Sequence, residues 1–122
     1  MAKVSQQENF DQLVLEAIDQ GLSSLGEAGK ASIYIHLESR FNIRKQEIPN
    51  KIDGFSNALH RIFGLGAPQL EILIKKKLQE KIGELYKLDI PSRIAPNLTL
   101  TKYIELMKLF YKDKEKTGKT NT

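Results

Sequence analysis

The stretch from Ala31 to Ile82 constrains the fold most, because it holds three expected helices joined by two short connections. The helices are predicted over Ala31–Phe41, Pro49–Phe63 and Pro68–Ile82. Each has apolar residues at three- and four-residue spacing, which indicates a buried helical face. The connection from Gly64 to Ala67 has room only for a tight turn. This stretch predicts a helical protein.

Two further helices flank this central stretch. One is expected from about Glu8 to Ser24, and the other begins at Thr99, a good N-cap residue, and keeps an apolar face as far as Tyr111. The span from Glu84 to Asn97 is predicted to be an ordered loop lying over the core. The predicted fold class is therefore all-α, a compact bundle of about five helices with short connections and a disordered basic C-terminal tail.

Glycines and prolines indicate where the helices begin and end. Proline suits the first helical position, since its missing N–H has no helical partner there. Glycine favours the residue after a helix. On these grounds we expect Pro49 and Pro68 to open helices, Gly26, Gly64 and Gly83 to stop them, and residues 26–30 to form a linker.

Length and composition indicate one small domain over residues 1–111, followed by a flexible basic tail over residues 112–122. The chain has 122 residues and a formal net charge of +4, and part of that excess is in the tail. The absence of cysteine excludes a disulfide framework, a thiolate metal site and a cysteine nucleophile. With no signal peptide and no membrane-length apolar run, we expect a cytoplasmic protein that does not enter a membrane.

The sequence predicts no catalytic, metal or cofactor site. Residues 26–32 resemble a phosphate-binding loop, but Ala31 follows the lysine where magnesium binding needs serine or threonine. His36 and His60 share no metal-binding spacing. We therefore expect a protein that is not an enzyme and has no cofactor.

Clusters of basic residues are the candidate functional feature. The candidate surface for an anionic partner consists of Arg40, Arg44, Lys45, Lys75, Lys76, Lys77 and Lys81. A solvated helix face is the alternative, because Glu71, Gln79 and Glu80 are interleaved with the lysines. DNA binding is a further alternative. Residues 31–63 outline a helix-turn-helix whose second helix would enter the major groove, with the lysine-rich fourth helix beside it. A small-molecule pocket lined by Tyr34, Phe55, Phe63 and His60 is the third.

Several segments of the chain resemble a family of small archaeal helical domains. These segments are Ile33–Glu38, Phe41–Pro49, Phe55–Leu59, Ile62–Ala67, Leu70–Leu78 and Asn97–Tyr103. Similar domains are attached to response-regulator receivers as Nitrosopumilus-type output domains. The resemblance covers about residues 22–106. It implies an archaeal regulatory module and carries over no catalytic residue.

The leading hypothesis is a non-enzymatic regulatory or interaction domain, acting as a stand-alone signalling output module. It would present a surface to a protein partner, or self-associate through exposed apolar residues such as Ile35 or Ile72. The runner-up is a DNA-binding protein that uses the 31–63 helix pair.

Overall fold

The computed structural model describes the backbone of residues 6–86 and 98–120, and the side chains of residues 10–84 and 98–112. Within these ranges the chain is helical and contains no strand, which confirms the predicted all-α bundle. The α-helices are α1 (Gln6–Leu22), α2 (Gly26–Phe41), α3 (Ile52–Phe63), α4 (Ala67–Tyr86) and α5 (Leu100–Thr120). Short 3-10 helices lie between them: η1 (Ser23–Leu25), η2 (Lys45–Asn50) and η3 (Gly64–Gly66).

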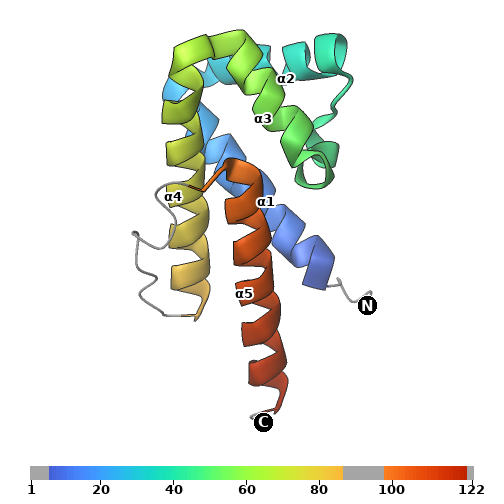
Figure 1. Cartoon of the computed structure of the whole chain (residues 1–122), viewed down its shortest axis with the longest axis vertical. Coiled ribbons are helices and arrows are strands. Elements are labelled where there is room, and N and C mark those ends of the chain that lie inside the picture. Colours follow the sequence, from blue (N-terminus) through green and yellow to red (C-terminus); the bar gives the residue numbers. More distant parts are fainter. Residues whose placement is uncertain (1–5, 87–97, 121–122) are drawn as a thin grey trace.

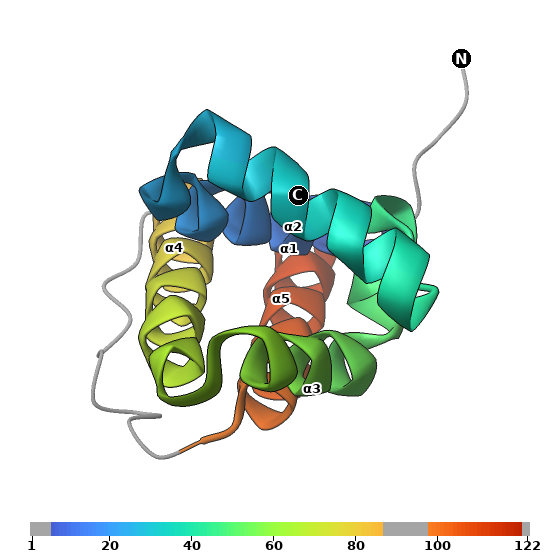
Figure 2. The ribbon, with the colours of Figure 1, turned by 90° about the horizontal axis from the view of Figure 1, so that it is seen from above.

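The helices form two groups. In Figure 1, α1, α4 and α5 make the long body of the molecule, and α2 and α3 lie across its upper end. Seen from above, α2 and α3 lie on opposite sides of the molecule and run in opposite directions (Figure 2). Helices of both groups contribute buried residues to the core, and α2 and α3 contact each other.

The apolar faces predicted from helical spacing meet in one hydrophobic core. On α1 the buried residues include Val14, Ile18 and Leu22, and on α4 they include Ile74 and Leu78. Buried residues of all five helices belong to the same cluster. Removal of this apolar surface from water is the main driving force for the fold.

Helices α1 and α4 lie in close contact at Gly21, which faces Ile74. A Cβ atom placed on Gly21 would lie 2.6 Å from Cγ1 of Ile74 and 3.3 Å from the Ile74 backbone nitrogen. Real Cβ atoms do not approach a neighbour that closely, so glycine is required by the packing. Close contact with a neighbouring helix therefore explains a glycine within α1, where it lowers helix propensity.

Three predicted helix ends are wrong. Residues 26–30 are the first turn of α2 and not a linker. The chain turns from η1 into α2 at Gly26, which has a positive φ of 83°. Pro49 lies inside η2, and α3 begins at Ile52. Gly83 lies inside α4, which continues to Tyr86. One glycine costs a helix only about 1 kcal/mol, which packing of the neighbouring buried Ile82 offsets.

The C-terminal helix begins as predicted. The Thr99 Oγ1 atom accepts a hydrogen bond from the backbone N–H of Lys102 at 3.1 Å, which is an N-cap. Helix α5 then continues to Thr120, past the apolar face that ends at Tyr111. The predicted flexible tail over residues 112–122 thus includes helical backbone, and its flexibility stays a prediction. Most of the predicted loop over residues 84–97 lies outside the described residues, and its first three residues belong to α4.

Candidate functional site

Most lysines of the predicted basic surface are engaged within the protein. The Lys75 ammonium donates to the backbone carbonyl of Leu98 at 2.6 Å, and Lys81 pairs with Glu16 at 3.3 Å. Lys77 pairs with Glu80, one turn further along the same helix, at 3.7 Å. The structure therefore does not bring the α4 lysines together into one free cationic patch.

The other predicted residues also separate. Lys45 contacts Asp19, and Arg44 lies at the start of η2, where its backbone N–H donates to Glu47 Oε1 at 2.9 Å. This hydrogen bond is the main reason that the pKa of Glu47 is lowered. Arg40 on α2 and Lys76 on α4 are exposed, and neither has a carboxylate partner among the described side chains. They lie on different helices.

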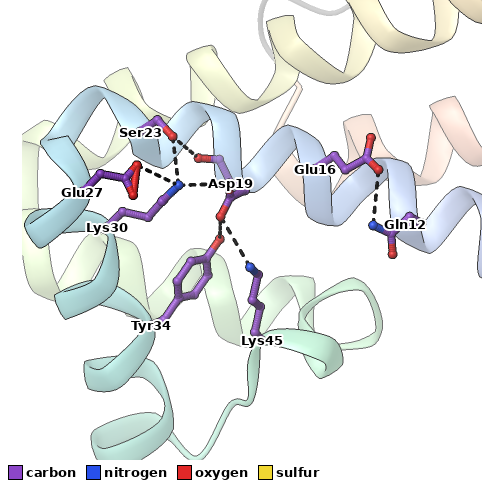
Figure 3. Close-up of polar contacts among 8 residues, drawn as sticks. All are labelled: Gln12, Glu16, Asp19, Ser23, Glu27, Lys30, Tyr34 and Lys45. Atoms are coloured by element: carbon purple, nitrogen blue, oxygen red, sulfur yellow. Dashed lines mark hydrogen bonds and ion pairs between the residues drawn. The ribbon is translucent and has the colours of Figure 1, made fainter.

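Asp19 is the centre of the largest polar cluster among the described residues, and the sequence-based prediction missed it. Figure 3 shows its carboxylate facing three donors from two other elements. Lys30 and Tyr34 of α2 each donate to it at 3.0 Å, and Lys45 of η2 lies 3.5 Å away. The Lys45 ammonium also lies 4.8 Å from the centre of the Tyr34 ring, a cation–π contact. Asp19 thus fastens α2 and η2 to α1.

Electrostatics in this cluster agree with a structural role. Burial tends to raise the pKa of Asp19, but the hydrogen bonds from Lys30 and Tyr34 outweigh it and the pKa is lowered. The hydrogen bond to Asp19 raises the pKa of Lys30. Burial and the same carboxylate raise the pKa of the Tyr34 hydroxyl. Each group is held in its ordinary charge state at neutral pH, which is unlike a catalytic acid or base.

An open pocket of about 360 Å³ adjoins the cluster. It is lined by Gln12, Leu15, Glu16, Asp19, Gln20, Lys45 and Gln46. Its charged groups already have partners: Glu16 accepts from Lys81 and from Gln12, and Lys45 lies against Asp19. A ligand there would have to compete with these contacts, so the pocket offers little free charge for recognition.

A second polar contact joins α3 to α4. The buried carboxylate of Glu71 accepts a short hydrogen bond from the Ser56 hydroxyl and lies 3.3 Å from His60 Nε2. Burial of a carboxylate is costly unless it is hydrogen-bonded, and these two partners satisfy it. The contact gives His60 a structural partner on α4.

The predicted small-molecule pocket does not gather its four residues. Phe55 is fully buried in the core, the Tyr34 hydroxyl is bonded to Asp19, and His60 lies at Glu71.

One buried polar atom, the hydroxyl of Tyr103, has no hydrogen-bond partner among the described residues, and burial raises the pKa of Tyr103 to about 12. Nor do the described side chains include a group of three or more residues suited to a metal ion.

An open groove of about 600 Å³ lies between α2 and α3. It is lined by His36, Arg40, Phe41, Arg61 and Ile62. Phe41 and Ile62 are half-buried, and the Phe41 ring lies 6.0 Å from the His36 ring. Arg40 and Arg61 are exposed and have no carboxylate partner among the described side chains. The groove thus combines two guanidinium groups that lack a carboxylate partner among the described side chains with an apolar floor, formed by Phe41 and Ile62 where they pack on the core.

Sequence reasoning identified Arg40 but not its association with Arg61. Both arginines lie in the last turn of their helices, where a cation faces the negative end of the helix dipole. That position has a structural cause of its own, so the sequence alone did not separate this pair from an ordinary helix-end charge.

Apolar side chains are exposed in several places. Ile35 and Ile72, predicted to be available for self-association, are 68% and 53% exposed. Leu65 in η3 is 99% exposed, and Leu106 and Leu109 of α5 are also exposed. These residues are on four different elements, so they do not define one continuous face from their positions in the sequence.

Comparison with known proteins gives no match among family models, curated proteins or solved structures. In the described part of the chain, no helix is both long and apolar enough to cross a membrane.

Proposed function

We propose that this protein is a non-enzymatic interaction domain that binds an anionic partner in the groove between α2 and α3. The observation that carries the proposal is that Arg40 and Arg61, from the two helices that line one open groove, have no carboxylate partner among the described side chains. Arginine presents a planar fork of donors that matches carboxylate and phosphate groups. A stand-alone signalling output domain would act in this way, by presenting a binding surface.

The use of the other cations supports the choice of this groove. Lys30, Lys45 and Lys81 each lie within 3.5 Å of a carboxylate oxygen, so part of their charge is already neutralised. A partner that approached them would have to replace an existing contact. At Arg40 and Arg61 no such contact has to be broken among the described side chains.

DNA binding is the second candidate function. Duplex phosphates would also accept hydrogen bonds from Arg40 and Arg61, and Lys76 on α4 is free to contribute. Helix α3, which was predicted to enter the major groove, has His60 and Arg61 in its last turn. However, His60 is engaged by Glu71, and the Lys75 and Lys81 ammonium groups contact Leu98 and Glu16.

The test compares two labelled polyanions, polyglutamate and duplex DNA, by fluorescence anisotropy at low and physiological salt. The variant is Arg40→Gln combined with Arg61→Gln. We expect it to lose about tenfold or more in affinity, because a hydrogen bond to a charged group contributes about 1.5–3 kcal/mol. The matched control, Lys102→Gln with Lys112→Gln, removes the same charge from two exposed positions on α5 that lie outside the candidate basic surface.

Equal losses in the variant and in the control would show that binding follows net charge and not the groove. That result, or no binding of either polyanion at low salt, would refute the proposed function. Preference for duplex DNA, with binding that falls steeply as salt increases, would favour the second candidate.

A further inference from the structure

We infer that the occupant of the α2–α3 groove is an acidic segment of a partner protein that carries an aromatic or large aliphatic side chain. This inference rests on the proposed function and names its partner. The acidic groups would pair with Arg40 and Arg61 at the edges of the groove, and the apolar side chain would pack on Phe41 and Ile62.

The apolar floor of the groove favours a protein partner over duplex DNA. Phe41 and Ile62 pack against the hydrophobic core and are only partly buried, so some of their apolar surface stays in contact with water. Burial of their exposed carbon surface would favour binding in proportion to its area. A duplex presents charged phosphates and sugars to a surface of this kind, and these groups leave the apolar floor unfilled. A partner with an apolar side chain fills it.

The edges of the groove indicate the charge of that partner. Arg40 comes from α2 and Arg61 from α3, and His36 is a third nitrogen-bearing side chain on the same lining. The described lining residues include no carboxylate. Because carboxylates accept two parallel hydrogen bonds from one guanidinium group, aspartate and glutamate side chains suit these positions. The lining is thus complementary in charge to an acidic segment.

The composition of the groove is also that of protein-binding surfaces. Arginine and aromatic residues are enriched where partner proteins contribute most binding energy, and lysine is depleted there. The groove contains two arginines and a phenylalanine and no lysine.

The test uses three synthetic peptides of equal length. The first contains aspartate and glutamate around one phenylalanine, the second replaces that phenylalanine by alanine, and the third replaces the acidic residues by lysine. We expect the first to bind about tenfold or more tightly than the second, since burial of one aromatic side chain has this effect. The third should not bind. These comparisons change the peptide and therefore leave the fold untouched.

Amide chemical-shift changes on titration with the first peptide locate its binding site on the protein. The inference predicts changes at His36, Arg40, Phe41, Arg61 and Ile62, and loss of binding in the Arg40→Gln/Arg61→Gln variant. Circular dichroism confirms that the variant is folded. Shift changes confined to the Asp19 pocket, with the groove unaffected, would overturn the inference.

The remaining outcomes distinguish the two proposals. Equal binding of the phenylalanine and alanine peptides, still dependent on the arginines, overturns the apolar anchor and leaves an anion-binding groove. Arginine-dependent binding of single-stranded or duplex DNA, with none of the peptides, overturns the protein partner and also leaves the groove. Absence of arginine-dependent binding to peptide and DNA alike refutes both proposals.

Discussion

The contact between α1 and α4 and the attachment of α2 use different kinds of interaction. Along α1 and α4 the contact is apolar and close, with Gly21 directly beside Ile74. Helix α2 also buries Ile33 and Leu37, but three polar bonds to Asp19 fix α2 and η2 against α1. Apolar packing tolerates little change of volume, whereas an exposed polar contact can be lost at smaller cost.

The α1–α4 contact therefore maintains the fold, whereas the α2–α3 groove is the surface that we propose for binding. The α1–α4 contact leaves no room for a ligand at Gly21. Helix α2 contacts both α1 and α3, and its last residues, Arg40 and Phe41, line the open groove. Substitutions should therefore have effects on stability that decrease from the α1–α4 contact, through Asp19, to the groove.

The largest effect is expected for Ile74→Ala. Ile74 is 1% exposed and packs against Gly21. Loss of its buried side chain should lower the free energy of unfolding by about 2–5 kcal/mol. Urea denaturation followed by circular dichroism measures this change. A loss no larger than that of the exposed control Ile72→Ala would mean that the α1–α4 contact is not close-packed in solution.

Gly21→Ala should be less severe but more specific. Alanine gains about 1 kcal/mol of helix propensity, yet its Cβ would overlap Ile74 Cγ1, and overpacking costs about 1–3 kcal/mol. We expect net destabilisation in the wild-type background. Combined with Ile74→Ala, which removes the overlapping atom, the same substitution should become neutral or stabilising. Additive effects in this double-mutant cycle would contradict the close approach.

Asp19→Asn should have an intermediate effect, about 1–2 kcal/mol at neutral pH, because it weakens hydrogen bonds to a charged acceptor. The pKa of Asp19 in the folded protein is lower than its ordinary value of 3.8. A lowered pKa means that the stabilisation is complete well above 3.8 and is lost as the pH falls through 3.8 toward the folded-state value.

The difference in unfolding free energy between wild type and Asp19→Asn should therefore shrink in acid. Urea titrations at neutral pH and below the ordinary aspartate pKa would measure it. The control is Glu80→Gln, which removes an exposed ion pair with Lys77. A difference that stays constant with pH would show that Asp19 does not hold α2 through its charge.

The smallest effect on stability is expected for Arg40→Gln combined with Arg61→Gln. Both side chains are exposed and have no carboxylate partner among the described residues. The free energy of unfolding should therefore change by less than about 0.5 kcal/mol. The same variant should lose partner binding. A large loss of stability would mean that these arginines stabilise the fold, which would contradict their assignment to the binding surface.

The buried faces could be predicted from the sequence, because helical spacing alone identifies them. Val14, Ile18 and Leu22 on α1, and Ile74, Leu78 and Ile82 on α4, are buried as their spacing indicates. Helix ends could not be predicted as well, since they depend on packing and on single backbone angles. Gly83 lies within α4 for this reason, and Gly26 turns the chain without ending the helical region.

The candidate site was harder to predict, because charges find partners far away in the sequence. Lys81 pairs with Glu16, 65 residues earlier, and Lys75 bonds to Leu98, 23 residues later. No local pattern shows that these lysines are engaged while Arg40 and Arg61 are free. Asp19 was missed for the same reason, since its partners Lys30 and Lys45 are 11 and 26 residues away.

The position of Leu65 makes this protein convenient to label. Leu65 lies in η3 between Gly64 and Gly66, is 99% exposed, and follows Ile62 of the groove by three residues. The chain contains no cysteine. Leu65→Cys would therefore introduce a single thiol at a position that contributes nothing to the core. An environment-sensitive fluorophore attached there would report when the end of α3 acquires a partner, without a second labelling site to confuse the signal.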